Sequence, residues 1–216
     1  MIRHEGFSRQ KRKAREEHRM SHHHGCHGGF ALDETRRRSW YNPDAILESL
    51  KEGMTFVDMG CGDGYFSILA AKKVGLKGKV YAVDIDPAGV EKLRKKAQAE
   101  GLTNIVTTVG KAEDTVFCRG CADMLLFSMD LHDFEDPAAV LQNAKAMLKP
   151  SGELVDLDWK KLSWEQQGAQ FGPPEQIRFS EEKVKKLLDA AGFTVESVAE
   201  AGPFHYVVTA KLANPS

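Results

Sequence analysis

The stretch Val57-Asp58-Met59-Gly60-Cys61-Gly62-Asp63-Gly64 places an acidic residue and three alternating glycines between an apolar segment and a helical one. The apolar run Thr55–Met59 predicts a short buried strand, and Tyr65–Val74 predicts a helix that ends at Gly75. Glycines at such a turn let the backbone bend tightly, and they let a ligand approach the main chain because no Cβ stands in the way. The stretch therefore predicts a ligand site at the end of a sheet strand.

Strands and helices alternate on both sides of this turn. The helices open on capping residues followed by proline, as in Asn42-Pro43, Asp86-Pro87 and Asp136-Pro137, and they close near glycine or proline. Connections of this length imply crossovers, and hence a parallel sheet with both faces covered. The further strands predicted are Lys79–Asp84, Ile105–Val109, Asp123–Ser128 and Glu153–Asp158, and the further helices are Pro43–Leu50, Pro87 to Gly101, Pro137–Leu148 and Glu181–Ala191.

The C-terminus departs from this alternation. Two strand-like segments, Thr194–Ala199 and Phe204–Leu212, are joined only by Glu200-Ala201-Gly202-Pro203. A parallel crossover needs about a dozen residues, so these strands must be antiparallel if they are neighbours. The fold class predicted is therefore α/β, a doubly wound, mostly parallel seven-stranded sheet with an antiparallel C-terminal strand at its end.

Composition excludes several classes of protein. The 216 residues are 42% hydrophobic and 28% charged with a net charge of −1, which is typical of a globular protein and gives no general attraction to nucleic acid or anionic lipid. No apolar run approaches the roughly 20 residues of a membrane span. Four cysteines are too few for a disulfide scaffold, and no apolar secretory segment is visible. We expect a cytoplasmic protein with reduced cysteines.

The first part of the chain differs from the rest. Residues 1–38 hold ten of the Lys and Arg residues and six of the eight His. We expect residues 1–38 to form a mobile basic arm, 39–212 to form the domain and 213–216 to form a tail. Met20 is an alternative start, which would make 1–19 an over-extended gene product. The run His22–His27 offers imidazole and thiolate groups to a metal, and the arm could touch RNA, but no metal site is assigned.

Two acidic residues indicate which kind of ligand the glycine turn binds. The turn lacks the third glycine position of a dinucleotide fingerprint, and Asp58 inside it would repel a phosphate but help to hold an ammonium group. Asp84 ends the next strand, where its carboxylate can accept both hydrogen bonds of a ribose diol. Together they favour a cationic nucleoside without phosphate.

The sequence here resembles the class I S-adenosylmethionine-dependent methyltransferases. Six stretches between residues 57 and 193 carry the likeness, which covers roughly residues 40–212, and the branch of the ubiquinone/menaquinone C-methyltransferases and arsenite methyltransferases is the most similar. The resemblance implies S-adenosyl-L-methionine as cofactor, and we expect a small-molecule acceptor. The near-zero net charge and the short apolar runs argue against a nucleic-acid partner and predict no membrane partner. The stretches are Val57–Gly64, Val80–Asp86, Gly110–Asp114, Asp123–Phe134, Met147–Gly152 and Ser180–Phe193.

The resemblance also implies roles for individual residues. Asp58, Gly60 and Gly62 would line the methionine half of the cofactor, and Asp84 would hold the ribose. Ile85 would flank the adenine and the backbone of Lys111 and Ala112 would border its edge; many relatives carry Asp where this chain has Lys111, so the contact there would come from the main chain. Ser128, at the end of the fourth strand, completes the candidate cofactor-binding residues.

Catalysis by such an enzyme rests mainly on positioning, and a base is needed only where the acceptor must lose a proton. His132 follows the fourth strand and titrates near neutral pH, so it is the candidate base, with Asp133 as its orienting partner or substitute. Trp159 either walls an apolar substrate site or covers the sheet edge, and 161–179 suits a loop over the substrate.

Two alternatives remain open at this point. Cys118 and Cys121 could supply the thiolates of an arsenite methyltransferase, or further ligands could make them a zinc site, although the arsenite family's cysteine spacing is not clearly reproduced. A different class would be a non-catalytic cofactor-binding protein whose N-terminal arm binds metal or RNA.

Overall fold

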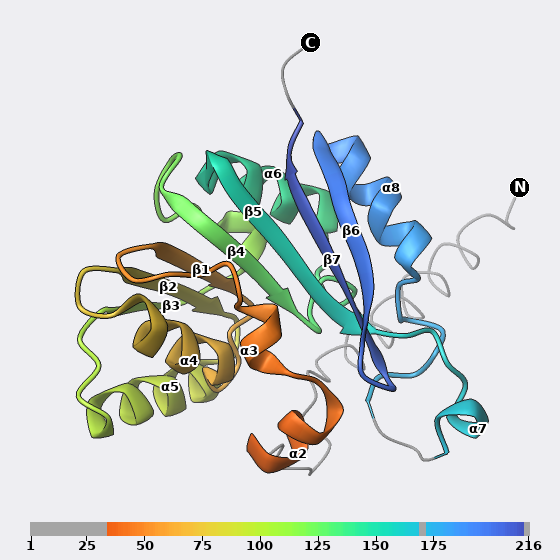
Figure 1. Ribbon diagram of the computed structural model, residues 1–216, viewed down its shortest axis with the longest axis horizontal. Helices are drawn as coiled ribbons and strands as arrows, with labels where there is room; N and C mark the ends of the chain where they lie inside the picture. The colour runs from red at the N-terminus through yellow and green to blue at the C-terminus, as the bar shows by residue number, and fades with distance from the viewer. Residues whose placement is uncertain (1–33, 169–171, 214–216) are drawn as a thin grey trace, which may run out of the picture. The chain divides into compact units, whose positions relative to one another are not determined.

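The computed structural model describes residues 34–168 and 172–213, which belong to one compact unit beginning at Asp33. In these residues a single sheet of seven strands has the order β3-β2-β1-β4-β5-β7-β6 (Figure 1). The strands are β1 (Thr55–Met59), β2 (Lys79–Asp84), β3 (Ile105–Val109), β4 (Ala122–Ser128), β5 (Leu148–Trp159), β6 (Phe193–Ala201) and β7 (His205–Leu212).

Helices connect the parallel strands and begin where the sequence places capping residues. Asp86 accepts hydrogen bonds from the amides of Ala88 and Gly89, and Ser180 accepts one from Lys183, so the orphan amides of two helix starts are satisfied. The helical segments are α2 (Glu34–Trp40), α3 (Pro43–Ile46), α4 (Tyr65–Val74), α5 (Pro87–Ala99), the 3₁₀ turn η1 (Ala112–Asp114), α6 (Pro137–Met147), α7 (Trp164–Gln167) and α8 (Glu181–Ala191).

The predicted fold class is confirmed. Strands β1 to β5 pair in parallel, and β7 is antiparallel to both β5 and β6. The reversed strand is not at the end of the sheet as expected, because β7 pairs with β5 and leaves β6 at the edge. Strand order reverses between β1 and β4, whose connections run to opposite sides of the sheet.

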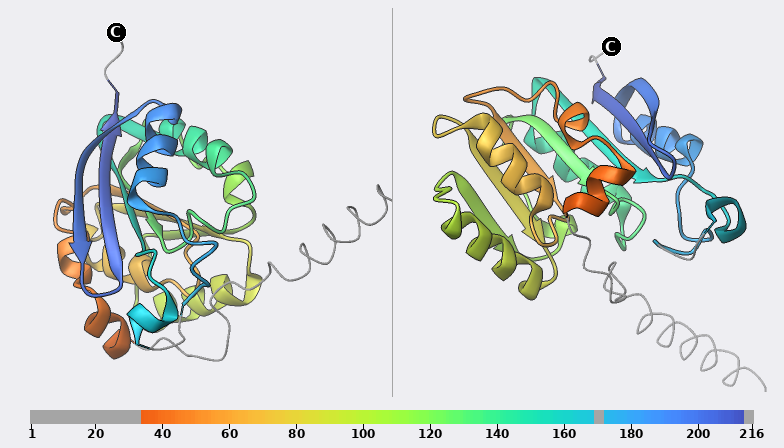
Figure 2. Two further views of the ribbon diagram at one scale, coloured as in Figure 1. Left: turned by 90° about the vertical axis from the view of Figure 1, so that its right-hand side faces the viewer. Right: turned by 60° about the horizontal axis from the view of Figure 1, so that its bottom comes forward.

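Helices cover both faces of the sheet, so strand residues alternate between two apolar layers. Phe56, Met124 and Leu126 pack with α4 on one face, while Val57 and Leu125 pack with α6 and α8 on the other. The left view of Figure 2 looks along the sheet and shows α6 and α8 together on one side of β6 and β7. Asp58 therefore shares the face of Phe56, toward α4.

Several predicted boundaries move. The expected division between arm and domain at residues 38 and 39 falls inside α2, and the first predicted helix ends at Ile46 rather than Leu50. Strand β5 begins at Leu148, because the backbone continues through Pro150 to Gly152 past an irregularity in its register with β4. The expected loop 161–179 contains the short helix α7. None of the helices in residues 34–168 and 172–213 is long and apolar enough to cross a membrane.

Candidate functional site

The candidate site lies where the strand order reverses. The glycine turn follows β1 and the segment Met129–Phe134 follows β4, and these two strands pair directly. In an open α/β sheet, the carboxyl ends of strands at such a switch point are where ligands bind. The tips of β2 and β5 lie on either side, so four strand ends contribute residues.

The glycine turn is held by hydrogen bonds to β2. The amides of Gly60 and Cys61 both donate to the carbonyl of Val83 at 2.9 Å. Gly60 has a φ of +84°, and a Cβ added there would lie 2.7 Å from the carboxyl carbon of Asp130, so only glycine fits. Gly62 has a φ of +50° and no heavy atom within 4 Å of a Cβ position, so this part of the turn is open to a ligand.

Asp84 joins the tips of β1 and β2. Its Oδ2 accepts a hydrogen bond of 2.7 Å from the amide of Gly62, and its Oδ1 accepts one of 2.8 Å from the amide of Asp86. Each carboxylate oxygen has two lone pairs, so both oxygens can still accept from the hydroxyls of a ribose. The neighbouring Ile85 is 54% exposed, which suits an apolar wall beside a flat base.

Asp58 is buried between β1 and α4. It is 1% exposed, and its Oδ2 accepts a hydrogen bond of 2.5 Å from the hydroxyl of Ser67. Burial raises the pKa of Asp58 to about 7, although the hydrogen bond from Ser67 opposes this and the charge of Asp84 adds to it. The acid expected to line the methionine half of the cofactor is thus buried against α4, with Ser67 as its hydrogen-bond partner.

Asp130 is an acidic residue of the site that the sequence did not single out. Its Oδ2 is buried against Gly60 and has no hydrogen-bond partner among the described residues. Burial raises its pKa well above the ordinary value, and the charges of Asp84, Asp133 and Asp58 raise it further. The preceding residue, Met129, has a φ of +65°, a strained conformation that typically marks functional loops.

His132 forms a row with two carboxylates. Its Nδ1 lies 2.9 Å from Asp158 at the end of β5, and both side chains are fully buried. Its Nε2 lies 3.5 Å from Oδ1 of Asp133, whose side chain is 36% exposed. Burial lowers the pKa of His132, but the charge and hydrogen bond of Asp158 and then the charge of Asp133 outweigh it and leave the pKa raised. Nε2 has no hydrogen-bond partner among the described residues, so the row sets a buried imidazole nitrogen beside a partly exposed carboxylate.

The remaining candidate residues lie at the edge of this site. The side chain of Lys111 forms an ion pair of 2.9 Å with Glu135. Only the main chain of Lys111 was expected to border the adenine, and this ion pair does not involve it. Ala112 is buried and its carbonyl accepts a hydrogen bond of 3.0 Å from Asn143. Ser128 ends β4, half-buried, opposite Leu157 of β5.

Trp159 covers the sheet edge. It is 1% exposed, and a Cβ on Gly172 would meet its ring at 2.9 Å. The Arg178 guanidinium lies 5.3 Å from the Trp159 ring centroid and donates to the carbonyls of Lys160 and Pro173, which fixes the segment after β5. The structure supports the second interpretation of Trp159, in which its ring covers the edge of the sheet instead of lining a substrate site.

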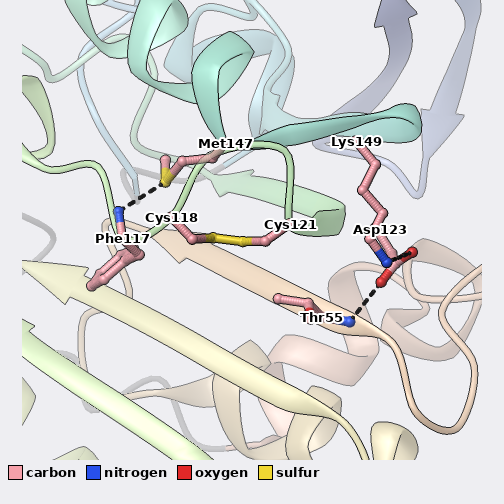
Figure 3. Close-up of a disulfide and its surroundings, with 7 residues drawn as sticks. All are labelled: Thr55, Phe117, Cys118, Cys121, Asp123, Met147 and Lys149. Carbon is pink, nitrogen blue, oxygen red and sulfur yellow. Dashed lines mark hydrogen bonds and ion pairs between the residues drawn. A yellow bond between two sulfur atoms is a disulfide. The ribbon is translucent and has the colours of Figure 1, made fainter.

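Cys118 and Cys121 are far from the site. They are joined by a disulfide just before β4, at the amino end of the sheet where β1 also begins with Thr55 (Figure 3). The structure thus has a disulfide where the sequence predicted reduced thiols. The position of these cysteines does not suit thiolates close to a methyl donor. In the part of the chain that the structure describes, no group of three or more His, Cys, Asp or Glu could hold a metal ion.

The arrangement fits a cationic nucleoside. Asp84 has acceptor capacity for a diol, Gly62 leaves space at the main chain, and Asp130 directs a buried, unpartnered oxygen at the turn. The predictions for the His-rich run, the residue 20 start and the tail concern residues outside those that the structure describes, apart from Ala213.

Residues 50–197 match a family described as a methyltransferase domain. This chain belongs to that methyltransferase family. The match spans the glycine turn, Asp84 and the His132 row. The family and the solved structures that resemble this domain indicate S-adenosylmethionine as its cofactor.

Curated relatives of this methyltransferase domain include enzymes of small-molecule metabolism. The aklanonic acid methyltransferase DauC of Streptomyces sp. strain C5 is 33% identical over 48% of this chain and 47% of its own. The ubiquinone/menaquinone biosynthesis C-methyltransferase UbiE of Hydrogenovibrio crunogenus is 27% identical over 58% of this chain and 50% of its own. The chain thus spans about half the length of the curated relatives it matches.

Solved structures extend the likeness over the whole methyltransferase domain. A SAM-dependent methyltransferase from Aquifex aeolicus has a TM-score of 0.77 at 31% identity, covering 84% of this chain and 95% of its own. An S-adenosylmethionine-dependent methyltransferase from Mesorhizobium loti has a TM-score of 0.62 at 17% identity, covering 79% and 98%, and shows the fold alone.

Sequence reasoning missed two acidic residues of this methyltransferase site. Asp130 and Asp158 both follow from the rule that carboxyl ends of parallel strands meet; Asp158 was predicted as the end of its strand, but without a partner.

Proposed function

We propose that this chain transfers a methyl group from S-adenosylmethionine to a small-molecule acceptor. The observation that supports this most directly is the glycine turn at the switch point, with Asp84 bonded to its main chain at Gly62. A buried oxygen of Asp130 faces the same turn. Family membership supports the reaction, and the geometry supports the place where the cofactor would be held.

The cofactor, when bound, supplies an electrophilic methyl group on a positively charged sulfur. Asp84 would hold its ribose, Ile85 and the main chain at Lys111 and Ala112 would border its adenine, and Gly60 and Gly62 would line its methionine half. Asp58, buried beside Ser67, would keep the turn in place. Holding donor and acceptor in line is worth roughly 7–11 kcal/mol in well-oriented reactions, so positioning is the chain's main contribution.

His132 and Asp133 would remove a proton from the acceptor. Because Nε2 of His132 is buried, we infer that Asp133 contacts the acceptor and passes the proton to the imidazole. Asp158 accepts the hydrogen bond of Nδ1–H in the neutral ring and so leaves the Nε2 lone pair toward Asp133. The acceptor oxygen or carbon then gains the methyl group, and its proton resides on His132.

This assignment favours an acceptor with an acidic O–H or C–H group. A nucleophile that carries no removable proton would not need the row formed by Asp158, His132 and Asp133. The names of the relatives agree in class, since they include a C-methyltransferase and the nocamycin O-methyltransferase of Saccharothrix syringae. We therefore propose carbon or oxygen as the methylated atom of a small-molecule acceptor.

Calorimetry with S-adenosylmethionine and S-adenosylhomocysteine tests the proposal. The wild-type chain should bind both, and Asp84→Ala should abolish binding because it removes the diol acceptor and releases Gly62. Asp114→Ala, which removes an acid of η1 outside the turn, serves as the control. An unchanged dissociation constant in Asp84→Ala would refute the assignment of that residue. A metabolite extract incubated with isotope-labelled donor should then yield a labelled product that identifies the acceptor.

A further inference from the structure

An arginine of α2 lies over the glycine turn. Nη2 of Arg37 is 3.6 Å from Oδ1 of Asp63 in the turn. Its guanidinium carbon is 4.8 Å from the ring centroid of Tyr65, the first residue of α4. The Arg37 side chain is only 16% exposed although α2 is a surface helix. A long cationic side chain is thus held between the turn and α4 rather than in solvent.

Arg37 influences buried groups near the turn. Burial raises the pKa of Tyr41 to about 12, and the charge of Arg37 is the largest influence that opposes this rise. Arg37 also acts, weakly, against the raised pKa of buried Asp58. The printed contacts place the guanidinium between Asp63 of the turn and the ring of Tyr65. This is the side of the turn assigned to the methionine half of the cofactor.

Arg37 is a cation beside a turn whose other charged residues are mostly acidic. Asp84 and Asp130 lie at the turn, and they suit the hydroxyls and the positively charged groups of the cofactor. They would repel its one anionic group, the carboxylate of the methionine part. The cations that contact the turn in the described residues are Arg37 and Lys96, and Lys96 forms a close pair of 2.6 Å with Asp63.

Asp63 does not depend on Arg37 for its charge balance. Nη2 of Arg37 is 3.6 Å from the Asp63 carboxylate, which is longer than the about 2.7–2.9 Å of a charge-assisted N–H···O bond. Lys96 already neutralises Asp63 at 2.6 Å. The guanidinium presents its N–H donors in a planar fork, so beside the turn it is suited to bind a carboxylate in a two-point contact.

We propose that Arg37 binds the carboxylate of the methionine part of the cofactor, which makes α2 a part of the cofactor site. This inference rests on the proposed function. The same guanidinium chemistry would suit a carboxylate on the acceptor, so the experiment must separate the two sources.

Calorimetry on the full chain provides the test. The ligands are S-adenosylhomocysteine and its decarboxylated analogue, which keeps the nucleoside, the sulfur and the amine. Arg37→Gln should weaken binding of S-adenosylhomocysteine about tenfold or more and leave the decarboxylated analogue within about twofold of wild type. Arg37→Lys should fall between these values for S-adenosylhomocysteine. Arg38→Gln is the matched control, because Arg38 pairs with Glu34 and Asp44 instead, and it should leave both affinities unchanged.

Several outcomes would overturn the inference. Equal weakening of both ligands would mean that Arg37 only stabilises the turn, and a lower unfolding midpoint of the variant would accompany it. Unchanged cofactor affinity together with a raised KM for an acidic acceptor would assign Arg37 to the acceptor instead. In both cases the wild-type chain still binds S-adenosylhomocysteine and the proposed function stands. If the wild-type chain binds neither ligand, the proposed function fails as well.

Discussion

His132 and Asp158 face each other across the ends of β4 and β5, with Nδ1 of the imidazole 2.9 Å from the carboxylate and both side chains fully buried. A buried carboxylate beside an imidazole stabilises the protonated ring, which is why the pKa of His132 is raised despite burial. If the neutral ring is the base, the rate of methyl transfer should rise with pH through that raised pKa.

Asp158→Asn should move this rise to lower pH, because it removes the charge that favours the protonated ring. It should also lower the maximal rate about tenfold or more, since the tautomer is no longer fixed. The pH dependence of kcat for wild type and variant measures both effects, and Glu135→Gln, at an acid that pairs with Lys111 instead of His132, is the control. A profile whose midpoint does not move would mean that Asp158 holds the loop without acting on the base.

Asp130 should favour the charged cofactor over its uncharged product. Its unpartnered oxygen at Gly60 would meet a positive group, and S-adenosylmethionine has a charge on sulfur that S-adenosylhomocysteine lacks. Asp130→Asn should therefore weaken the binding of S-adenosylmethionine about tenfold more than the binding of S-adenosylhomocysteine. Titration calorimetry with both ligands measures the ratio. Asp63→Asn, at an acid already paired with Lys96, should leave the ratio unchanged, and an unchanged ratio in Asp130→Asn would contradict the role.

Gly60 and Gly53 form a natural pair for testing the turn. Both have nearly the same left-handed φ, +84° and +83°, but a Cβ on Gly53 meets no atom within 4 Å while one on Gly60 meets Asp130 at 2.7 Å. Gly53→Ala should cost only the conformational strain, about 1–2 kcal/mol of unfolding free energy. Gly60→Ala should cost more and also weaken cofactor binding. Urea denaturation and calorimetry on both variants check this, and equal costs would show that the contact with Asp130 is unimportant.

Local patterns predicted most of the fold. The strands β1, β2 and β3 and the helices α4 and α8 begin and end where the apolar runs and caps place them. Helix α2 was missed because none of its residues is buried; Arg37 and Arg38 hold it by ion pairs with Asp63, Glu34 and Asp44. Pairs of exposed side chains leave no apolar periodicity in the sequence, and the partner Asp63 lies in the turn beyond β1.

The site was predicted in part for the same reason. Asp84 and the glycines follow from a motif, and His132 from its position after a strand. Its partner Asp158 lies 26 residues further on, and only the pairing of β4 with β5 brings the two together. The C-x-x-C spacing of Cys118 and Cys121 was equally compatible with thiols, a metal site or the disulfide that the structure contains.

The protonation of Asp58 should make the stability of the cofactor-free chain depend on pH. In the unfolded chain this carboxyl loses its proton near pH 4, whereas burial raises its folded pKa to about 7. Between these values the folded state binds the extra proton, so unfolding free energy falls as pH rises, by up to about 1.4 kcal/mol per pH unit. Below about pH 4 the carboxyl of Asp58 is protonated in both states, so its contribution to the free energy of unfolding no longer changes with pH. Above about pH 7 it is ionised in both states, and its contribution is again constant.

Asp58→Asn isolates that contribution from the other buried acids, Asp130 and Asp156, whose pKa values are also raised. An amide at this position is uncharged and can still bond the hydroxyl of Ser67. Urea denaturation from pH 4.5 to pH 7 should show the wild type losing stability relative to the variant as the pH rises. A constant difference between the two proteins would mean that Asp58 is already ionised at the lower pH, and that a positive charge at the turn offsets its burial.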